Sequence, residues 1–554
     1  MKSYFNLLLV FVFIQTSYIA FSQNKAPDIL WQQTIGGSNA DVLTAMAIGP
    51  DKSIVLCGYS NSKSSGNKSH ASFGGYDYWV VKLDANGSIL WNRTFGGNKD
   101  DFASAIICTS DGGYLLGGSS ISDKSGTKSN KSYGFSYDYW VLKLDGNGNK
   151  IWDRTLGGFY NDKLASLAEL PNAGGYVIGG YSYSQDNGSK TITNLGAESN
   201  ADYWVIVLNN NGNERMQNLF GGGSLEILTC VAPVGTTGPN SYYAAGWSYS
   251  TKRPGYKSEK VFGNNDYYVV RYNTATKKTE YQGDFGGKLS DYLTCMQPLA
   301  DRSIILGGYS NSYKSDTKKT NFFGATDYWL LKLLPNGKKQ WDKTIAGGGG
   351  GDYLMSVQQT KDKGFILGGY SNSKTGVNKT ENSRGGYDYW IVKTDSLGRV
   401  QWDKTIGGNA DDKLTAVYEV DSNRYVVAGT SASAKSGDKN MGVIGPNGTD
   451  FWVLALDTPA PVGVTPEYSQ SKLEIMPNPV KDILTIRYNA AAIDKHNVSF
   501  VIYAADGKAV LQSTLTAVSQ ESTLSFNVAN LPSGSYFAVM YTGNDKVTKA
   551  FIKE

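Results

Sequence analysis

The residue types that most often carry catalysis are scarce in this 554-residue sequence. Its two histidines, His70 and His496, lie more than 400 residues apart. No Ser-His-Asp or Cys-His arrangement can be built from them within one repeat region, and the sequence has neither a His-rich metal cluster nor a phosphate-binding GxxxxGKS/T loop. We therefore predict no catalytic residue, no metal site and no cofactor.

Four cysteines fall singly in different segments, without the CxxC spacing of a metal site or the density of a disulfide scaffold. We interpret Cys57, Cys108, Cys230 and Cys295 as small buried residues. Cys230 and Cys295 occupy equivalent repeat positions, so a disulfide between them is an alternative that the geometry must decide.

Acidic residues are the remaining candidates for chemistry. An acid follows a glycine pair in seven segments, and two carboxylates about 5 to 10 Å apart suffice for glycoside hydrolysis. A polysaccharide-cleaving enzyme is therefore the competing function, and a ring of cation ligands is a further interpretation. Because the acid recurs in every segment, whereas a catalytic site breaks symmetry, we favour capping of loop N–H groups. The seven acids are Asp41, Asp101, Asp162, Glu226, Asp291, Asp352 and Asp411.

Basic residues gather in seven long connections rich in Ser, Asn and Gly, such as SNSKSSGNKSHASFGGY, whose formal charges sum to +11. Loops on a rigid scaffold commonly carry function, so we expect these connections to contact an anionic glycan, a surface polysaccharide or extracellular DNA. The alternative is that the lysines only solvate an exported particle. The candidate binding residues are Lys63, Lys68, Lys124, Lys128, Lys252, Arg253, Lys257, Lys318, Lys319, Lys374 and Lys379.

The elements that must position these residues form an internal repeat. A segment like DYWVVKLD begins at Asp77, Asp138, Asp202, Asp266, Asp327, Asp388 and Asp450, at spacings of 61 to 64 residues. Its alternation predicts a strand with a wholly apolar face. An Asn-Gly turn follows, and then a second tryptophan-bearing strand such as ILWNRTFGG. The tryptophans that we expect to hold the repeats together are Trp79, Trp91, Trp140, Trp152, Trp204, Trp329, Trp341, Trp390, Trp402 and Trp452.

Four strands in a period near 60 residues predict the blades of a β-propeller. The segment 29–37 is an unpartnered fourth strand, and the last DFWVLALD, at 450–457, has no fourth strand of its own. We therefore expect a seven-bladed all-β propeller over residues 27–457, in which the N-terminal strand completes the last blade and removes exposed edges.

The repeat resembles β-propeller repeats that are common in surface proteins of bacteria with a type IX secretion system. It carries their units DYWVVKLD, NG, W-[D/N]-[R/K]-T-[F/I/L]-GG and Y-[L/I/V]-[L/I/V]-GG-Y-S. Weaker similarities link the glycine doublets to kelch repeats and LDxNGxxxW to the tryptophan-docking repeat of quinoprotein dehydrogenases. In both of those families the matching residues mainly hold blades together.

Both ends of the chain carry transport signals. Lys2, the apolar run at 7–14 and Ala20-Phe21-Ser22 predict a signal peptide over 1–22, and that run is too short to span a bilayer. After a Pro-rich linker at 458–471, residues 472–554 resemble the type A C-terminal sorting domain of the type IX system, a β-sandwich. The matching positions are Pro477-Asn478-Pro479, Asp506-Gly507-Lys508, Leu531, Gly534, Tyr536, Lys549, Phe551 and Lys553, whereas Glu554 departs from the usual basic finish.

The sequence therefore predicts an exported, non-enzymatic binding or scaffold protein at the outer-membrane surface or outside the cell. We expect its loops to contact a glycan, a polyanion or a protein. The expected partners are the type IX machinery, through the C-terminal domain, and an anionic glycan or surface polymer. No nucleic-acid motif and no transmembrane segment is expected in the mature chain, and a formal charge of +4 is too small to imply nucleic acid.

Overall fold

The computed structural model describes residues 26–554 except 172–173, 197–199, 236–240, 253–255, 259–260, 447, 458–472, 490–497, 505–507, 516–520 and 543–544. The predicted signal peptide and linker lie outside the described residues. The chain divides into two compact units, Met1–Thr458 and Pro459–Glu554. Every helix or strand assigned to the described residues is a β-strand.

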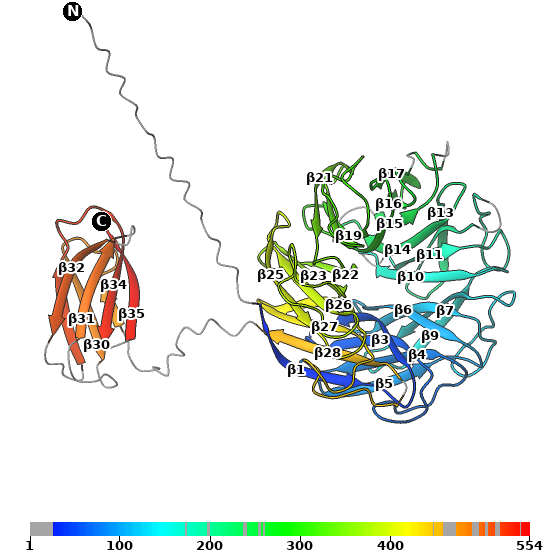
Figure 1. The fold of residues 1–554 in the computed structure, drawn as a ribbon, viewed down its shortest axis with the longest axis horizontal. Helices are drawn as coiled ribbons and strands as arrows, with labels where there is room; N and C mark the ends of the chain where they lie inside the picture. The colour runs from blue at the N-terminus through cyan, green and yellow to red at the C-terminus, as the bar shows by residue number, and fades with distance from the viewer. Residues whose placement is uncertain are drawn as a thin grey trace, which may run out of the picture. The chain divides into compact units, whose positions relative to one another are not determined.

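In the first unit, the described residues form seven four-stranded antiparallel sheets, which we number as blades 1 to 7. Figure 1 shows the sheets arranged around a common centre. Blade 1 consists of β2 (Asp41–Ile48), β3 (Ile54–Ser60), β4 (Asp77–Leu83) and β5 (Ile89–Phe95). Blade 2 consists of β6 (Asp101–Cys108), β7 (Tyr114–Ser120), β8 (Asp138–Leu144) and β9 (Lys150–Leu156). Blade 3 consists of β10 (Asp162–Glu169), β11 (Tyr176–Ser182), β12 (Asp202–Leu208) and β13 (Glu214–Phe220).

The next three blades repeat this order of strands. Blade 4 consists of β14 (Glu226–Pro233), β15 (Ser241–Ser248), β16 (Asp266–Asn273) and β17 (Lys278–Phe285). Blade 5 consists of β18 (Asp291–Pro298), β19 (Ile304–Ser310), β20 (Asp327–Leu333) and β21 (Lys339–Ile345). Blade 6 consists of β22 (Asp352–Gln359), β23 (Phe365–Ser371), β24 (Asp388–Thr394) and β25 (Val400–Ile406).

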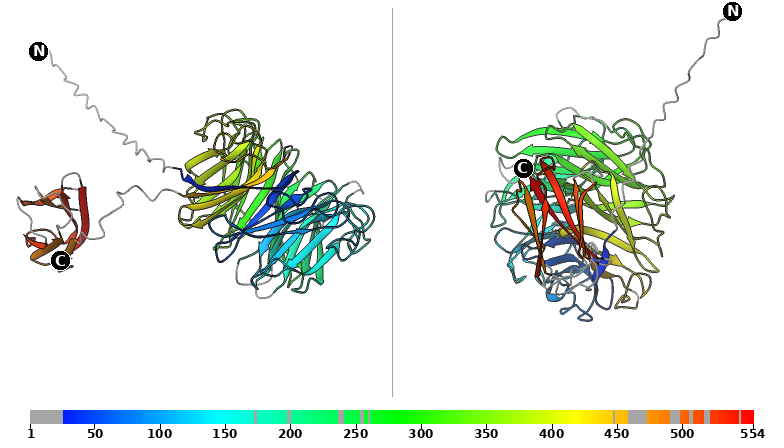
Figure 2. Two further views of the ribbon diagram at one scale, coloured as in Figure 1. Left: turned by 90° about the horizontal axis from the view of Figure 1, so that it is seen from below. Right: turned by 90° about the vertical axis from the view of Figure 1, so that its left-hand side faces the viewer.

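Blade 7 joins the two ends of the propeller. Its strands are β26 (Asp412–Asp421), β27 (Arg424–Ser431), β28 (Asp450–Asp457) and the N-terminal β1 (Asp28–Ile35), which pairs antiparallel with β28. In the left view of Figure 2 the N-terminal blue strand lies at the edge of this blade, beside its yellow strands. The Gln32 amide donates to the Asp438 carbonyl at 2.8 Å, and the Trp452 indole donates to Gln32 Oε1 at 3.1 Å. The predicted closure by the N-terminal strand is therefore present.

The third strand of each blade explains the repeated DYW. Tyr78 and Trp79 are buried, and the Tyr78 hydroxyl donates to the Trp140 carbonyl of the next blade at 3.1 Å. The same bond links five further neighbouring pairs of blades at 3.0 to 3.1 Å. Blade 7 has Phe451 instead, whose ring lies 4.9 Å from that of Trp79. The tyrosine needs space, and a Cβ on Gly118 would lie 2.6 Å from the Tyr78 hydroxyl.

The second tryptophan of the repeat packs on the Asn-Gly turn of the following blade. Gly148 has φ +78°, and a Cβ there would lie 2.9 Å from the Trp91 ring. Gly337 has φ +81° and meets Tyr281, one of the two residues that replace this tryptophan. The turn glycine is thus required both by its backbone conformation and by close contact with an aromatic ring.

The second unit contains two sheets that enclose one hydrophobic core, which includes Leu484, Ile486, Phe500 and Phe526. One sheet is β29 (Leu473–Met476), β30 (Ile483–Asn489) and β33 (Glu521–Asn527). The other is β32 (Ala509–Leu515), β31 (Val498–Ala504), β34 (Gly534–Thr542) and β35 (Asp545–Lys553).

Candidate functional site

The long connections lie at one end of the propeller, which we call the loop face. In blade 1, β2 and β4 begin at this end and β3 ends there, because Asp41 pairs with Ser60 and Ser60 with Asp77. The connections between blades reach the same end. The loop face therefore carries both the basic connections and the recurring acids.

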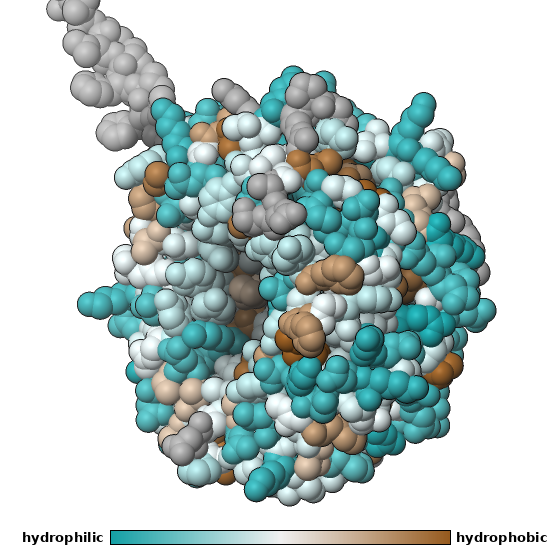
Figure 3. Space-filling model, turned by 90° about the vertical axis from the view of Figure 1, so that its right-hand side faces the viewer, coloured by the Kyte–Doolittle hydropathy of each residue, from teal (hydrophilic) through white to brown (hydrophobic). Residues whose placement is uncertain are grey.

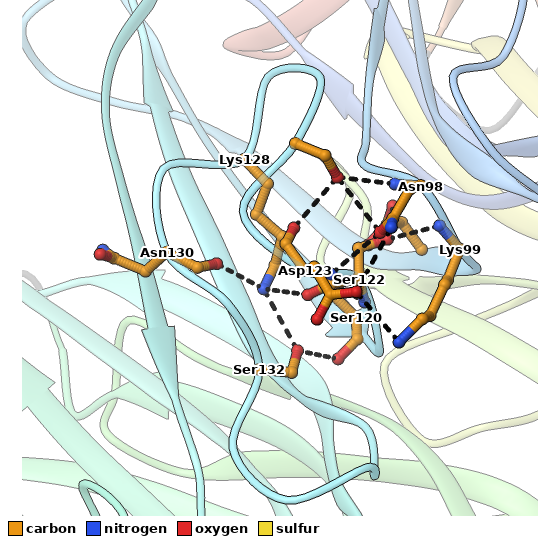
Figure 4. Close-up of polar contacts among 10 residues, drawn as sticks. Asn98, Lys99, Ser120, Ser122, Asp123, Lys128, Asn130 and Ser132 are labelled. Atoms are coloured by element: carbon orange, nitrogen blue, oxygen red, sulfur yellow. Dashed lines mark hydrogen bonds and ion pairs between the residues drawn. The ribbon is translucent and has the colours of Figure 1, made fainter.

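A buried lysine organises each long connection. Figure 4 shows Lys128 turned inward, where its Nζ donates to the carbonyl oxygens of Ser122 and Asn130 and to Ser132 Oγ at 3.3, 2.9 and 3.2 Å. The Nζ also lies 5.9 Å from the centre of the Trp140 ring. All seven connections have such a lysine, and the seven are Lys68, Lys128, Lys190, Lys257, Lys318, Lys379 and Lys439.

Pairs of buried carboxylates flank these lysines. Asp101 begins β6, and its Oδ2 accepts from the Gly97 N–H at 2.7 Å and from Ser122 Oγ at 2.9 Å. Asp138 begins β8, and its carboxylate accepts from the Tyr133 N–H. Both acids cap loop N–H groups, which supports the capping interpretation over a cation ring. Each kind recurs in every blade, with Glu226 as the one glutamate.

The last of the seven predicted capping acids is corrected by the structure. Asp412, not Asp411, accepts from the Gly408 N–H at 2.7 Å and from Ser433 Oγ at 2.8 Å. Asp411 instead accepts from the Tyr387 N–H at 3.1 Å. Two consecutive acids follow this glycine pair, and the strand begins at the second.

Burial dominates the ionisation of these groups. It raises the pKa of Asp138 to about 8, with a further increase from Asp162 in the next blade. Burial also lowers the pKa of Lys128 to about 8, although Asp101 and Asp138 oppose that decrease. Both directions have the same cause, because the neutral form of either group loses less hydration than its charged form.

The fourth strand anchors the same connections through a residue that the sequence analysis did not single out. Asp153 accepts from the Trp140 indole at 3.0 Å and from the Ser129 N–H at 3.0 Å. Equivalent bonds are made by Asn92, Gln217, Asp342, Asp403 and Gln32. The acid or amide that follows the second tryptophan position in the repeat is the sequence signal that could have identified this anchor.

The structure changes the set of predicted binding residues. Lys68, Lys128, Lys257, Lys318 and Lys379 are buried, so they cannot meet a ligand at the surface. Lys63, Lys124, Lys252, Lys319 and Lys374 are exposed, and Arg253 lies outside the described residues. Setting the seven buried lysines aside lowers the formal charge of the long connections from +11 to +4. The loop face is thus much less basic than its sequence indicates.

Half-buried aromatic side chains cluster where the inner strands reach the loop face. Around blades 1 and 2, Phe102 lies 4.9 Å from Tyr59, 5.5 Å from Tyr76 and 5.8 Å from Tyr137, measured between ring centres. Lys163 Nζ lies 3.1 Å from the centre of the Tyr137 ring. These rings form the first arc of what we call the aromatic belt.

A second arc of the aromatic belt spans blades 4 to 6. It contains Trp247, Tyr292, Tyr309, Tyr353, Tyr370 and Tyr387, with successive ring centres 5.0 to 5.3 Å apart. Lys413 Nζ lies 5.2 Å from the Tyr387 ring centre. The belt comes from three positions of the repeat, one on the first strand, one on the second strand and one just before the third. These positions are separated in the sequence, which is why the repeat pattern did not reveal the belt.

The first strands of the blades enclose an axial cavity of about 280 Å³. Hydroxyl groups link neighbouring blades around it: Ser104 Oγ donates to the Leu164 carbonyl at 2.7 Å, and Thr294 Oγ1 to the Leu354 carbonyl at 2.5 Å. Cys230 and Cys295 also line this cavity, and both are free thiols. The Cys230 thiol donates to the Thr294 carbonyl at 3.4 Å, so the alternative of a disulfide is absent from this structure.

A larger hollow of about 560 Å³ lies on the loop face between blades 2 and 3. We call it the blade 2–3 pocket, and its lining residues are Gly134, Phe135, Ser136, Phe159, Tyr160, Asn161 and Tyr183. Figure 3 shows one side of the propeller, where the surface is hollowed near its middle and apolar side chains stand in small groups among polar ones. Neither this pocket nor the axial cavity is lined by a described acidic residue.

The sorting residues predicted from the sequence surround the last strand of the second unit. Asn478 Oδ1 accepts from the Ile552 N–H at 2.9 Å, the Tyr536 hydroxyl donates to the Pro532 carbonyl at 2.8 Å, and Lys549 Nζ donates to the Leu473 carbonyl at 3.1 Å. Pro477 and Pro479 flank Asn478, Gly534 begins β34, and the Lys553 side chain is buried. Asp506 and Gly507 lie outside the described residues.

The described residues contain no group of three or more His, Cys, Asp or Glu side chains able to hold a metal ion. They also include no helix long and apolar enough to cross a membrane.

Solved structures resemble the chain only distantly. A fungal alcohol oxidase of the AA5 family, in complex with copper, has 11% identity and a TM-score of 0.36, covering 96% of this chain and 100% of its own. A Xanthomonas campestris gluconolactonase has 8% identity and a TM-score of 0.30, covering 78% and 95%. A DUF4221 family member from Bacteroides vulgatus has 8% identity and a TM-score of 0.31, covering 78% and 98%. Such scores carry no statement about activity.

None of the curated proteins matches the chain. Residues 474–554 match the family model described as the secretion system C-terminal sorting domain. This match covers the sandwich and the sorting positions above. Residues 474–554 are therefore a type IX C-terminal sorting domain, which marks the chain for export to the cell surface or the extracellular space.

Proposed function

We propose that the propeller is a non-enzymatic binding module, displayed at the cell surface or released outside the cell, whose loop face binds a glycan. The aromatic belt is the observation that carries this proposal. Flat, half-exposed rings offer large apolar contact area at low cost in conformational entropy. The apolar face of a pyranose ring matches such a surface, and its hydroxyl groups match the surrounding Ser, Asn and Tyr side chains.

The burial of seven lysines favours a glycan over a polyanion. Binding of a polyanion depends on several exposed cations and on the release of counterions. The long connections keep a formal charge of only +4 once their buried lysines are set aside. Aromatic contacts are not screened by salt, so they become the dominant source of affinity.

The alternative of a carboxylate-dependent enzyme has less support. Close acids from neighbouring blades do occur, such as Asp138 and Asp162, but they are buried and repeat around the whole ring. A catalytic pair needs contact with substrate and a position that differs from its repeats. Acidic side chains are also missing from the described lining of both cavities.

Affinity electrophoresis of the full chain through gels that contain neutral or acidic polysaccharides tests the proposal. We expect retardation by at least one neutral polysaccharide, unchanged between about 50 and 200 mM salt, the range over which multiply charged contacts weaken steeply. Retardation only by acidic polymers, lost at the higher salt concentration, would instead establish the polyanion. Free migration in every gel would contradict the proposal.

A further inference from the structure

The blade 2–3 pocket breaks the symmetry of the propeller. At the two positions after the glycine pair, the other between-blade connections have residues such as Asn98-Lys99 and Asn409-Ala410, whereas this connection has Phe159-Tyr160. Phe159 and Tyr160 are 58% and 46% exposed, and Phe135 on the neighbouring connection is 93% exposed. Leaving three large aromatic side chains in water is unfavourable, which indicates that a ligand covers them.

The backbone under these side chains is held firmly. The Phe159 N–H donates to Asn187 Oδ1 at 2.7 Å, and the Tyr160 N–H to Ser184 Oγ at 3.0 Å. Ser136 Oγ donates to the Tyr160 carbonyl at 2.8 Å, which ties the two connections together. The backbone that carries Phe159 and Tyr160 is therefore fixed before any ligand arrives, so binding at these two residues requires little ordering of the main chain.

Size and charge identify the kind of occupant. A volume of about 560 Å³ lies within the range of small-molecule sites, roughly 300 to 1,000 Å³. Its seven lining residues are far fewer than the roughly 20 to 30 a side of a stable protein interface. The lining contains Ser136, Asn161 and Tyr hydroxyls as polar groups, and every lining residue is uncharged.

The pocket also continues the aromatic belt. Ser136 immediately precedes Tyr137 of the first arc. The ring centre of Tyr183 lies 6.2 Å from that of Tyr181, which occupies on β11 the position that Tyr59 of the first arc occupies on β3. Resting on the proposed function, we infer that the blade 2–3 pocket is a subsite for one neutral pyranose unit of a glycan whose chain crosses the belt. Phe159 and Tyr160 stack on the apolar face of the sugar, and Asn161 contacts its hydroxyl edge.

Isothermal titration calorimetry of the full chain with neutral hexasaccharides tests this inference. The ligands are β-1,4-glucan, β-1,3-glucan and α-1,6-mannan fragments, and their sulfated forms are titrated for comparison. Phe159→Ala and Phe135→Ala are the test variants. Phe323→Ala is the matched control, because Phe323 is 52% exposed on a long connection of blade 5 and does not line the pocket. We expect each test variant to weaken binding of a neutral fragment about tenfold and the control to leave it unchanged.

The outcomes separate the subsite from the proposed function. Neutral binding that survives both pocket substitutions would overturn the subsite and leave the glycan-binding function standing. Binding of only the sulfated fragments would overturn the neutral subsite as well. Failure of every fragment to bind would remove both proposals. Sedimentation showing self-association that Phe135→Ala abolishes would assign the pocket to a second copy of the chain.

Discussion

Replacing one buried loop lysine isolates the role that the structure assigns to all seven. Lys128→Met keeps most of the side-chain volume against the Trp140 ring but removes the ammonium group. The carbonyl oxygens of Ser122 and Asn130 then lose their Lys128 donor, and Asp101 and Asp138 lose their nearest cation. We expect the connection between β7 and β8 to loosen and the propeller to lose stability.

The magnitude follows from competing effects. The Ser122 and Asn130 carbonyls keep other donors, the Ser132 N–H and the Thr155 hydroxyl, so the loss is that of hydrogen bonds from a buried charged group, which contribute about 1.5 to 3 kcal/mol each. Breaking a buried ion pair costs about 3 to 5 kcal/mol, and the attraction of Lys128 to Asp101 and Asp138 adds less than this because no ion pair joins them among the described residues. The variant also avoids burying the lysine, and Asp138, with a pKa raised to about 8, is largely neutral at pH 7. These two effects offset part of the loss, so we expect a decrease of about 2 to 4 kcal/mol in the free energy of unfolding.

Urea unfolding followed by tryptophan fluorescence measures this change. All twelve tryptophans lie between Trp31 and Trp452, so the signal reports the propeller and not the sorting domain. Lys124→Met is the matched control, since Lys124 is exposed on the same connection and should change stability by less than about 0.5 kcal/mol. Equal stability of Lys128→Met and the wild type would refute the assigned role, as would an equal loss in both variants.

Three further predictions concern the blades. The pKa of Asp138 is raised from 3.8 to about 8, so its contribution to stability is complete below pH 3.8 and is lost as pH rises through 8. Between pH 5 and pH 9, Asp138→Asn should therefore lose less stability than the wild type, whereas the exposed Asp145→Asn should follow the wild type. Parallel stability curves for all three proteins would contradict the assignment. Phe451→Tyr should gain about 1 kcal/mol by donating to the Trp79 carbonyl, as six blades do; a lower urea midpoint would show that the ring closes differently. Thr294→Val removes the bond to the Leu354 carbonyl and should cost about 1 kcal/mol in the same assay, and no change would show that the hydroxyls around the axial cavity do not join the blades.

The architecture could be predicted from the sequence because the same structural signals recur in successive repeats. DYW supplies the buried tyrosine and tryptophan, Asn-Gly supplies a turn, and the unpartnered strands at 29–37 and 450–457 define the closure. Each signal depends on backbone conformation or on burial within one repeat. The strands and their order within each blade were therefore predicted correctly.

The loop lysines were not predictable from composition, because a Lys among Ser, Asn and Gly resembles a solvated loop. Their spacing held the missing signal. In each blade the second strand ends at the first serine of a Ser-x-Ser motif, as at Ser60 with Ser62. The lysine follows that first serine after eight residues in six blades and after nine in blade 4. Such constancy in a loop of variable length indicates a structural contact. The aromatic belt and the blade 2–3 pocket depend on contacts between blades, which a single repeat cannot show.

Because β1 pairs with β28, the ring can be completed only after the whole propeller has been synthesised. A chain that ends before Asp450 leaves the first strand without a neighbour, and it also lacks the sorting domain of residues 474–554. Such truncated products therefore lack both the closed ring and the sorting domain. Any chain synthesised as far as the sorting domain therefore also contains both strands of the pair that closes the ring.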